Sequence, residues 1–123
     1  MSRVWNSVWK ASSRPRVQRL FRAVAPKHFA GRFLNAHLSK ELREKLKTRS
    51  IRVRKGDSVR VLSGSFSKRD GVVERVDVKN GAVFIGGVDR VKKNGGKVPY
   101  PIIVSRIVIT GLKSDPRRSA NAS

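Results

Sequence analysis

Residues 72–85, VVERVDVKNGAVFI, predict a β-hairpin. Val72, Val76 and Val78 share one parity, so an extended chain would present them on a single apolar face. Asn80-Gly81 then leads into a second apolar run, and Asn and Gly tolerate the positive φ angles that a two-residue type I′ turn requires. This hairpin indicates an all-β fold.

The same pattern continues through residues 50–112, which we predict to form the globular part of the chain. Short runs rich in Val and Ile alternate with Gly-containing turns, as is typical of a small all-β barrel or sandwich. A second hairpin is expected around residues 94–96, and residues 107–109 supply the last strand. Pro99 and Pro101 cannot donate backbone hydrogen bonds, so their strand is expected to be an edge strand or an interrupted one.

The chain is strongly basic. Its 123 residues carry 29 Lys and Arg against 8 Asp and Glu, a formal net charge of +21. Small soluble domains usually have a net charge with a magnitude of about 2–8, and a larger excess repels itself unless a polyanion neutralises it. The charge therefore indicates a nucleic-acid partner, with an anionic membrane surface as a weaker alternative.

The sequence lacks the residues that several classes of function require. There are no cysteines, which excludes disulfides, thiolate metal sites and cysteine nucleophiles. His28 and His37 have no carboxylate or serine at a useful spacing, and no glycine-rich phosphate loop is present. The longest uncharged stretch, residues 80–88, is too short to span a bilayer. We therefore expect no catalytic site, no metal, no cofactor and no small-molecule substrate. The basic residues also lack the sustained apolar helical face that binding to a membrane surface needs, so we expect no membrane partner.

Residues 1–37 form a basic arm without a single acidic residue. This composition fits two interpretations. The arm could lie along a phosphate backbone, or it could be a mitochondrial transit peptide, since such peptides have the same composition. Val4, Trp5, Val8 and Trp9 also form an apolar stripe at helical spacing, which either packs on a protein neighbour or stacks its indoles on RNA bases.

Residues 38–49 predict a short helix. Ser39 can accept a hydrogen bond from an unpaired N–H of the first turn, and Leu42 and Leu46 give the helix one narrow apolar edge. A helix of about nine residues is not stable alone, so it must dock on protein or RNA. Residues 113–123 have no apolar periodicity and are expected to be a disordered tail in the free protein.

A loop between two strands of the globular part is the candidate binding loop. It lies within the sequence GDSVRVLSGSFSKRDGVV, in which Gly56, Gly64 and Gly71 recur and Lys68 and Arg69 supply charge. At Gly71 the missing side chain allows a bulge or a close backbone approach. A tight, basic, Ser-rich loop can press N–H groups and cations against phosphates. The same residues would also suit a solvated turn.

This loop resembles the KOW motif of ribosomal and transcription-elongation proteins. Its flanks resemble the archaeal and eukaryotic branch of the twenty-fourth family of large-subunit ribosomal proteins, and the similarity runs from about Ser13 to Arg118. The segments that carry it are Pro15-Arg16, Gln18-Arg19, Ala25-Pro26-Lys27-His28, residues 38–45 and 52–57, Lys92-Lys93-Asn94-Gly95, Val98, Tyr100-Pro101-Ile102, Ser105-Arg106-Ile107 and Leu112. The family usually has glycine at position 68, where this chain has lysine, and Trp5 and Trp9 have no counterpart.

The resemblance implies an SH3-like barrel that binds large-subunit rRNA directly, beside neighbouring ribosomal proteins, in the cytoplasmic ribosome. It also implies a role in early subunit assembly near the exit of the peptide tunnel, and no enzymatic activity. The side chains then expected to contact RNA are Arg14, Arg16, Arg19, Arg22, Lys27, His28, Arg32, Lys40, Arg43, Arg49, Arg52, Arg54, Lys55, Ser65, Ser67, Lys68, Arg69, Lys92, Lys93 and Lys97. Gly56, Gly64 and Gly71 are the expected loop glycines.

Two alternatives stay open at this point. A KOW-containing regulator of transcription or translation would bind RNA or protein, and would normally join the motif to a separate N-terminal domain. An imported organellar ribosomal protein would lose part of residues 1–37 on maturation.

Overall fold

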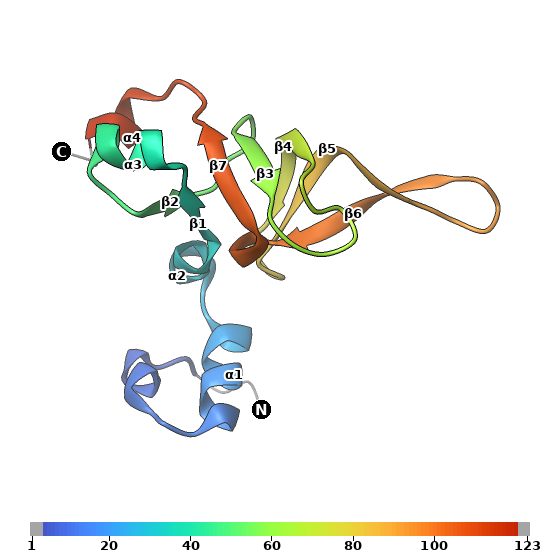
Figure 1. Cartoon of the computed structure of the whole chain (residues 1–123). Helices are drawn as coiled ribbons and strands as arrows, with labels where there is room; N and C mark the ends of the chain where they lie inside the picture. Colours follow the sequence, from blue (N-terminus) through green and yellow to red (C-terminus); the bar gives the residue numbers. More distant parts are fainter. Residues whose placement is uncertain (1–3, 121–123) are drawn as a thin grey trace.

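The protein is built on one seven-stranded sheet. The computed structural model describes residues 4–120, so residues 1–3 of the arm and 121–123 of the tail lie outside the described part (Figure 1). The strand order is β2-β1-β7-β3-β4-β5-β6. The strands are β1 (Asn35–Leu38), β2 (Ser50–Arg52), β3 (Ser58–Val61), β4 (Asp70–Asp77), β5 (Ala82–Val91), β6 (Lys97–Ile103) and β7 (Ile107–Gly111). The predicted mainly-β, barrel-like class is confirmed.

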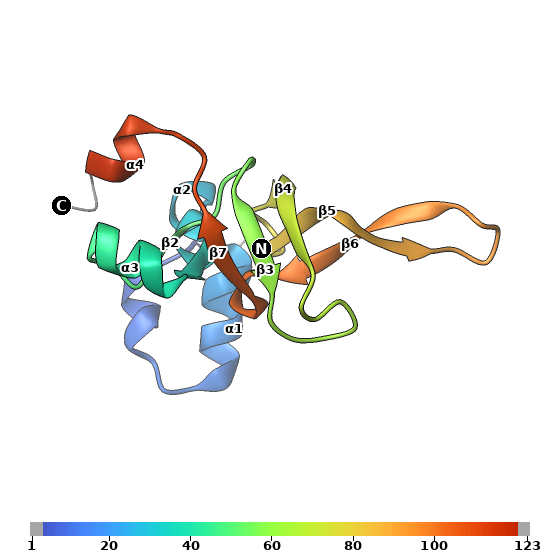
Figure 2. The ribbon, with the colours of Figure 1, turned by 45° about the horizontal axis from the view of Figure 1, so that its top comes forward.

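Short helices precede, interrupt and follow the strands. They are η1 (Ser7–Ala11), α1 (Pro15–Val24), α2 (Lys27–Ala30), η2 (Gly31–Leu34), α3 (Lys40–Leu46), η3 (Val104–Arg106) and α4 (Pro116–Ala120), where η denotes a 3₁₀ helix. The N-terminal helices extend from one side of the sheet, and the β5–β6 hairpin projects from another (Figures 1 and 2). The two projections are therefore well separated on the molecule.

The core is aliphatic and lies against the inner face of the sheet. Strands β1 and β3 alternate strictly between exposed and buried positions. The buried side chains are Leu34, Ala36, Leu38, Val53, Val59, Val61, Val73, Val83, Ile85, Val88, Ile102, Val104, Ile107 and Ile109. Because Leu34, Ala36 and Leu38 belong to this set, the end of the basic arm is part of the barrel core.

The β4–β5 hairpin forms where it was predicted, but two details of the prediction are wrong. Its loop has four residues, 78–81, between Asp77 and its partner Ala82, and of the two predicted turn residues only Gly81 has positive φ, 64°. The register of β4 shifts between Val73 and Arg75. This bulge changes the parity of the strand, so Val73 is buried while Val72 is half exposed.

Asp77 organises the hairpin loop. Its carboxylate accepts hydrogen bonds from the side chain of Asn80 (2.7 Å) and from the backbone N–H groups of Lys79 and Asn80. The side-chain hydrogen bond from Asn80, followed by the backbone one, lowers the pKa of Asp77 below its ordinary value. A carboxyl with a depressed folded-state pKa contributes stability above its unfolded pKa and loses it as the pH falls through the folded value.

Asn80→Ala is therefore expected to raise the pKa of Asp77 toward its ordinary value. An NMR pH titration of the Asp77 carboxyl measures it. Asn94→Ala is a matched control, because Asn94 accepts from Gly96 in the other hairpin and does not contact Asp77. An Asp77 pKa that is unchanged by Asn80→Ala would show that the backbone donors alone account for the shift.

The segment before α3 differs from the prediction. Leu38 belongs to β1, which pairs antiparallel with β2 and parallel with β7. Ser39 stands at the N-cap position of α3, but its side chain makes no capping hydrogen bond; instead its backbone N–H donates to the carbonyl of Ile109 (3.0 Å). Pairing of β1 with the barrel therefore positions the start of the helix.

The disorder predicted for the C-terminal tail is wrong for residues 113–118. The guanidinium of Arg118 is buried and donates to both carboxylate oxygens of Asp57, at 2.6 and 2.8 Å, and to the carbonyl of Arg52 at 2.7 Å. Asp57 also accepts from the N–H groups of Arg54 and Lys113. The tail lacks apolar side chains at regular spacing, so this buried ion pair and its additional hydrogen bonds hold it on the barrel.

The second predicted hairpin is confirmed. Val91 of β5 faces Lys97 of β6, and the strands continue to pair as far as Ala82 and Ile103. Strand β6 ends the strand order, so the expectation of an edge strand at Pro99 and Pro101 is also confirmed. An edge position suits these prolines because no outer neighbour requires their missing N–H groups.

Candidate nucleic-acid interface

The arm is folded around a small aromatic cluster. The ring of Trp5 lies 5.4 Å from Phe21 and 4.8 Å from Phe29, measured between centroids, and Phe33 packs edge-on to both phenylalanines. Of the two interpretations of the apolar stripe, packing on protein holds for Trp5. The cluster ties α1, α2, η2 and the residue Trp5, which precedes η1, into one unit, so the arm presents a defined surface.

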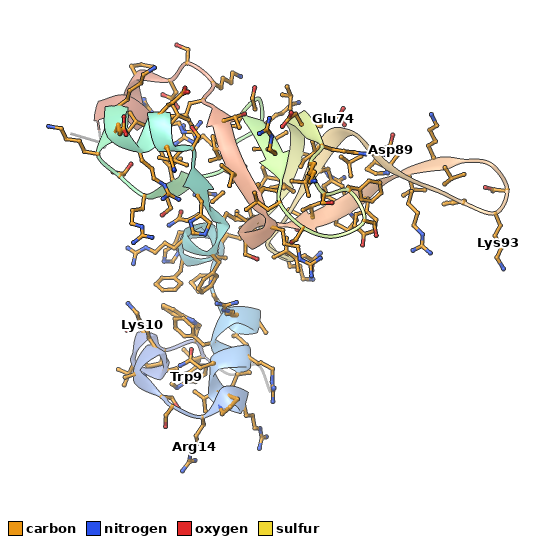
Figure 3. All side chains as sticks on the ribbon, in the orientation of Figure 1. Trp9, Lys10, Arg14, Glu74, Asp89 and Lys93 are labelled. Carbon is orange, nitrogen blue, oxygen red and sulfur yellow. The ribbon has the colours of Figure 1, made fainter. Side chains whose placement is uncertain are left out.

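The basic side chains along α1 lie on the surface of the arm. Phe21 is buried, whereas Arg14, Arg16, Arg19 and Arg22 are exposed. Figure 3 shows Arg14 at the far end of the arm, directed away from the barrel. The helix therefore displays a row of cations outward.

Two arm arginines lie over the cluster's rings. The guanidinium of Arg22 is 5.3 Å from the centroid of Phe33, and that of Arg32 is 5.1 Å from Phe29. Such contacts hold a guanidinium in place while leaving its N–H groups able to donate. These two residues are therefore preorganised donors, and the sequence alone did not reveal their aromatic partners.

The candidate loop between β3 and β4, residues 62–69 and called the KOW loop below, is closed by backbone hydrogen bonds. Lys68 N–H donates to the carbonyl of Val61 (2.8 Å), and Val61 N–H donates to that of Arg69 (2.9 Å). Gly71 meets the expectation of a close approach: a Cβ there would lie 2.5 Å from Ile85 Cγ2 and 2.8 Å from the carbonyl oxygen of Gly86. Gly71 therefore lets the first residues of β4, which follow the loop, pack directly against β5.

Lys68 occupies a conformation that favours glycine, with φ of 65°. The resemblance to the family led us to expect glycine at this position, and here a lysine adopts the left-handed conformation instead. We expect Lys68→Gly to raise the free energy of unfolding by up to about 1 kcal/mol, because positive φ costs an L-residue roughly 1–2 kcal/mol and the greater unfolded-state freedom of glycine offsets about 0.5–1 kcal/mol.

Chemical denaturation measures this change. Arg69→Gly is the matched control: it removes the neighbouring cation at a residue without positive φ, and it is expected to destabilise the protein. Equal losses in both variants would contradict the account of Lys68.

Two of the remaining barrel arginines form ion pairs, and three basic residues line a groove. Arg60 donates to Asp70 at 2.6 and 3.1 Å, and this exposed pair lowers the pKa of Asp70 and raises that of Arg60. Arg54 is paired with Asp115. Arg52, Lys55 and Arg54 line a groove of about 640 Å³ against β4. This groove brings together three of the predicted contacts that lie at and after the end of β2.

Nearly all the predicted RNA contacts are on the surface. Among them only Arg43, on α3, is half-buried; the other nineteen are exposed. The structure distributes them over the arm, the barrel groove and loop, and the β5–β6 hairpin, where Lys93 lies toward the free end (Figure 3). They do not form one compact patch, so a partner that contacts them all must be extended.

Sequence reasoning missed three basic side chains near these surfaces. Arg75 lies in the same groove as Arg52, with its guanidinium 4.2 Å from the ring centroid of Phe84. Arg90 and Arg106 are exposed beside the hairpin and the KOW loop, respectively. Arg75 and Arg90 lie in strands β4 and β5, and Arg106 ends η3, so no single local pattern relates the three.

The described part of the chain contains neither a metal-binding cluster nor a membrane-spanning helix. Residues 4–120 hold no group of three or more His, Asp or Glu side chains that could bind a metal ion. None of the helices in this range has both the length and the apolar character needed to cross a membrane.

Comparison with known proteins identifies the family. Residues 12–121 match the family described as ribosomal proteins L26 of eukaryotes and L24 of archaea. The chain belongs to this family. It is 49% identical to large ribosomal subunit protein uL24 of Methanocorpusculum labreanum over 104 residues, 85% of this chain and 86% of that protein. It is 44% identical to the uL24 of Methanoregula boonei, over 87% of this chain and 88% of that protein.

Membership agrees with the resemblance found from the KOW loop and its flanks. The match begins at residue 12 and covers the rest of the arm, the barrel and the docked C-terminal segment. Residues 12–37 and the α4 segment therefore belong to the part of the chain that the family shares, and the chain has a structural ribosomal role.

Proposed function

We propose that this protein binds large-subunit rRNA directly and helps the large subunit to assemble early, near the exit of the peptide tunnel. Its place of action is the ribosome, in the cytoplasm, with neighbouring ribosomal proteins as additional partners. The observation that carries this proposal is the distribution of exposed cations over the arm, the barrel and the hairpin. A long RNA is an extended polyanion and can contact all three at once.

The arm and the barrel have separate tasks in this proposal. The cations of α1 neutralise backbone phosphates of RNA helices between which the arm lies. The KOW loop and the groove at Arg52 dock the barrel on a second region of RNA. Recognition is by shape and by unpaired elements, because side chains cannot read the narrow major groove of A-form RNA.

Salt dependence of binding to the cognate rRNA domain tests the proposal. If the protein contacts about eight phosphates, log K should fall with log[salt] with a slope of about −6 to −7. Arg16→Gln with Arg19→Gln should reduce the magnitude of that slope by about 1.4–1.8, since two phosphate contacts are lost. A deletion of residues 1–37 would be a poor test, because Leu34 and β1 belong to the barrel core.

Arg60→Gln is the matched control. Arg60 is exposed, but Asp70 already pairs with it, so its loss should leave the slope nearly unchanged. A wild-type slope close to zero would contradict direct rRNA binding. An unchanged slope in the arm double variant would remove the arm from the interface.

A further inference from the structure

An aromatic pair joins the KOW loop to the β5–β6 hairpin. Phe66, in the loop, and Tyr100, on β6, have ring centroids 5.1 Å apart and planes tilted by 49°. The guanidinium of Arg69 lies 5.2 Å from the ring centroid of Phe66. Phe66 is half-buried against the core, while Tyr100 keeps 36% of its surface exposed.

Tyr100 continues the inner face of β6 beyond the end of the core. It shares the parity of Ile102, which is buried at 5% exposure. Pro99 and Pro101 on either side have fixed φ angles, which limits the motion of the chain that carries the ring. The tyrosine is therefore a rigidly mounted aromatic surface without a covering layer in residues 4–120.

Grooves lie on both sides of this ring. Toward the hairpin end, Tyr100, Val98, Val91 and the prolines line a groove of about 530 Å³. Toward the KOW loop, Tyr100, Phe66 and Ser65 line a smaller groove of about 170 Å³. The aromatic pair thus separates two adjacent hollows along one edge of the sheet.

The rims of both grooves carry only positive charge. Arg90, Lys92 and Lys93 line the hairpin groove, and Arg106 lines the groove at the loop. No acidic side chain lines either groove among the described residues. Flat apolar surface within a cationic rim is the combination by which proteins hold unpaired nucleotides, with bases on aromatic rings and phosphates on cations.

We propose that the Tyr100 edge is a binding site for unpaired nucleotides of RNA. One base stacks on the exposed side of Tyr100, in the hairpin groove. Arg90, Lys92 and Lys93 hold the phosphates on that side, and Arg106 holds the strand as it passes the KOW loop. The proposal rests on the proposed rRNA binding and specifies a single-stranded segment as the element that this face recognises.

Binding of a single-stranded RNA of about ten nucleotides, compared with a duplex of the same sequence, tests the site. The full chain should prefer the single strand, and a 5-iodouridine in it should photocrosslink to Tyr100, located by mass spectrometry. Tyr100→Leu should weaken binding by about 5- to 150-fold, the effect of losing one stacked base. Tyr100→Phe should retain affinity because it keeps the ring.

Val72→Ala is the matched control, since Val72 is a half-exposed apolar residue outside both grooves. Thermal melting of each variant reports whether the fold is intact. Unchanged affinity in a folded Tyr100→Leu variant, or crosslinks confined to other residues, would overturn the site. An oligoglutamate peptide that binds at Tyr100 in place of the RNA would overturn it in favour of an acidic protein partner.

The two proposals fail in different ways. If the chain does not bind the rRNA domain at all, the proposed function fails. If it binds the rRNA domain with the expected salt slope and Tyr100→Leu has no effect, only the single-strand site fails.

Discussion

Replacing Asp57 with asparagine is expected to lower the free energy of unfolding by about 3–5 kcal/mol, because it leaves the guanidinium of Arg118 buried without its counter-charge. Asp57 is fully buried, and its carboxylate accepts hydrogen bonds from Arg118, Arg54 N–H and Lys113 N–H. An amide can accept only part of this set, and its NH₂ group would face other donors. This one side chain therefore connects the start of β3 to the C-terminal segment.

Urea unfolding followed by circular dichroism measures the loss. Asp70→Asn is the matched control, because it removes one member of an exposed Arg–Asp pair and is expected to change stability by about 0–1 kcal/mol. Limited proteolysis gives a second readout, since release of α4 should expose the chain after Gly111. Equal stability of the two variants would contradict a structural role for the buried pair.

Phe21→Ala is expected to open the arm. Phe21 is the arm's buried aromatic residue and contacts Trp5, Phe29 and Phe33. Removing a buried phenylalanine ring costs about 3–5 kcal/mol through lost burial and a cavity. All three of these partners lie in the arm, so the loss should concentrate there.

Hydrogen exchange resolves the effect by segment. Amides of α1 should lose protection, while amides of β3, β4 and β5 should keep theirs. The emission of Trp5 should shift to longer wavelength as its ring becomes hydrated. Val8→Ala is the control, because Val8 is largely exposed and outside the cluster. Unchanged protection of α1 in Phe21→Ala would show that the aromatic cluster does not hold the arm together.

The candidate site was partly predictable. Cationic side chains are rarely buried without a partner, so composition alone placed nearly all of them on the surface. It could not show that Arg22 and Arg32 lie over aromatic rings, or that Tyr100 meets Phe66. Each of these contacts joins residues that no local pattern relates. The contacts of Arg22 and Arg32 with aromatic rings hold their guanidinium groups in position to donate hydrogen bonds.

Local geometry explains what the sequence alone determined. Alternation of apolar residues and the glycine turns reflect φ, ψ and the two-residue period of a strand, and these are properties of a few neighbouring residues. They established the β fold, the two hairpins and the edge position of Pro99 and Pro101. The excess of 21 positive charges indicated a polyanionic partner.

Tertiary structure decided the features that depend on distant segments. The bulge in β4 moved Val73 rather than Val72 into the core. β1 became a strand because β2 and β7 offered it partners. The C-terminal segment became ordered because Arg118 meets Asp57 across 61 residues of chain. The free energy of such contacts comes from burial and pairing that exist only once the chain has folded, so no local pattern could encode them.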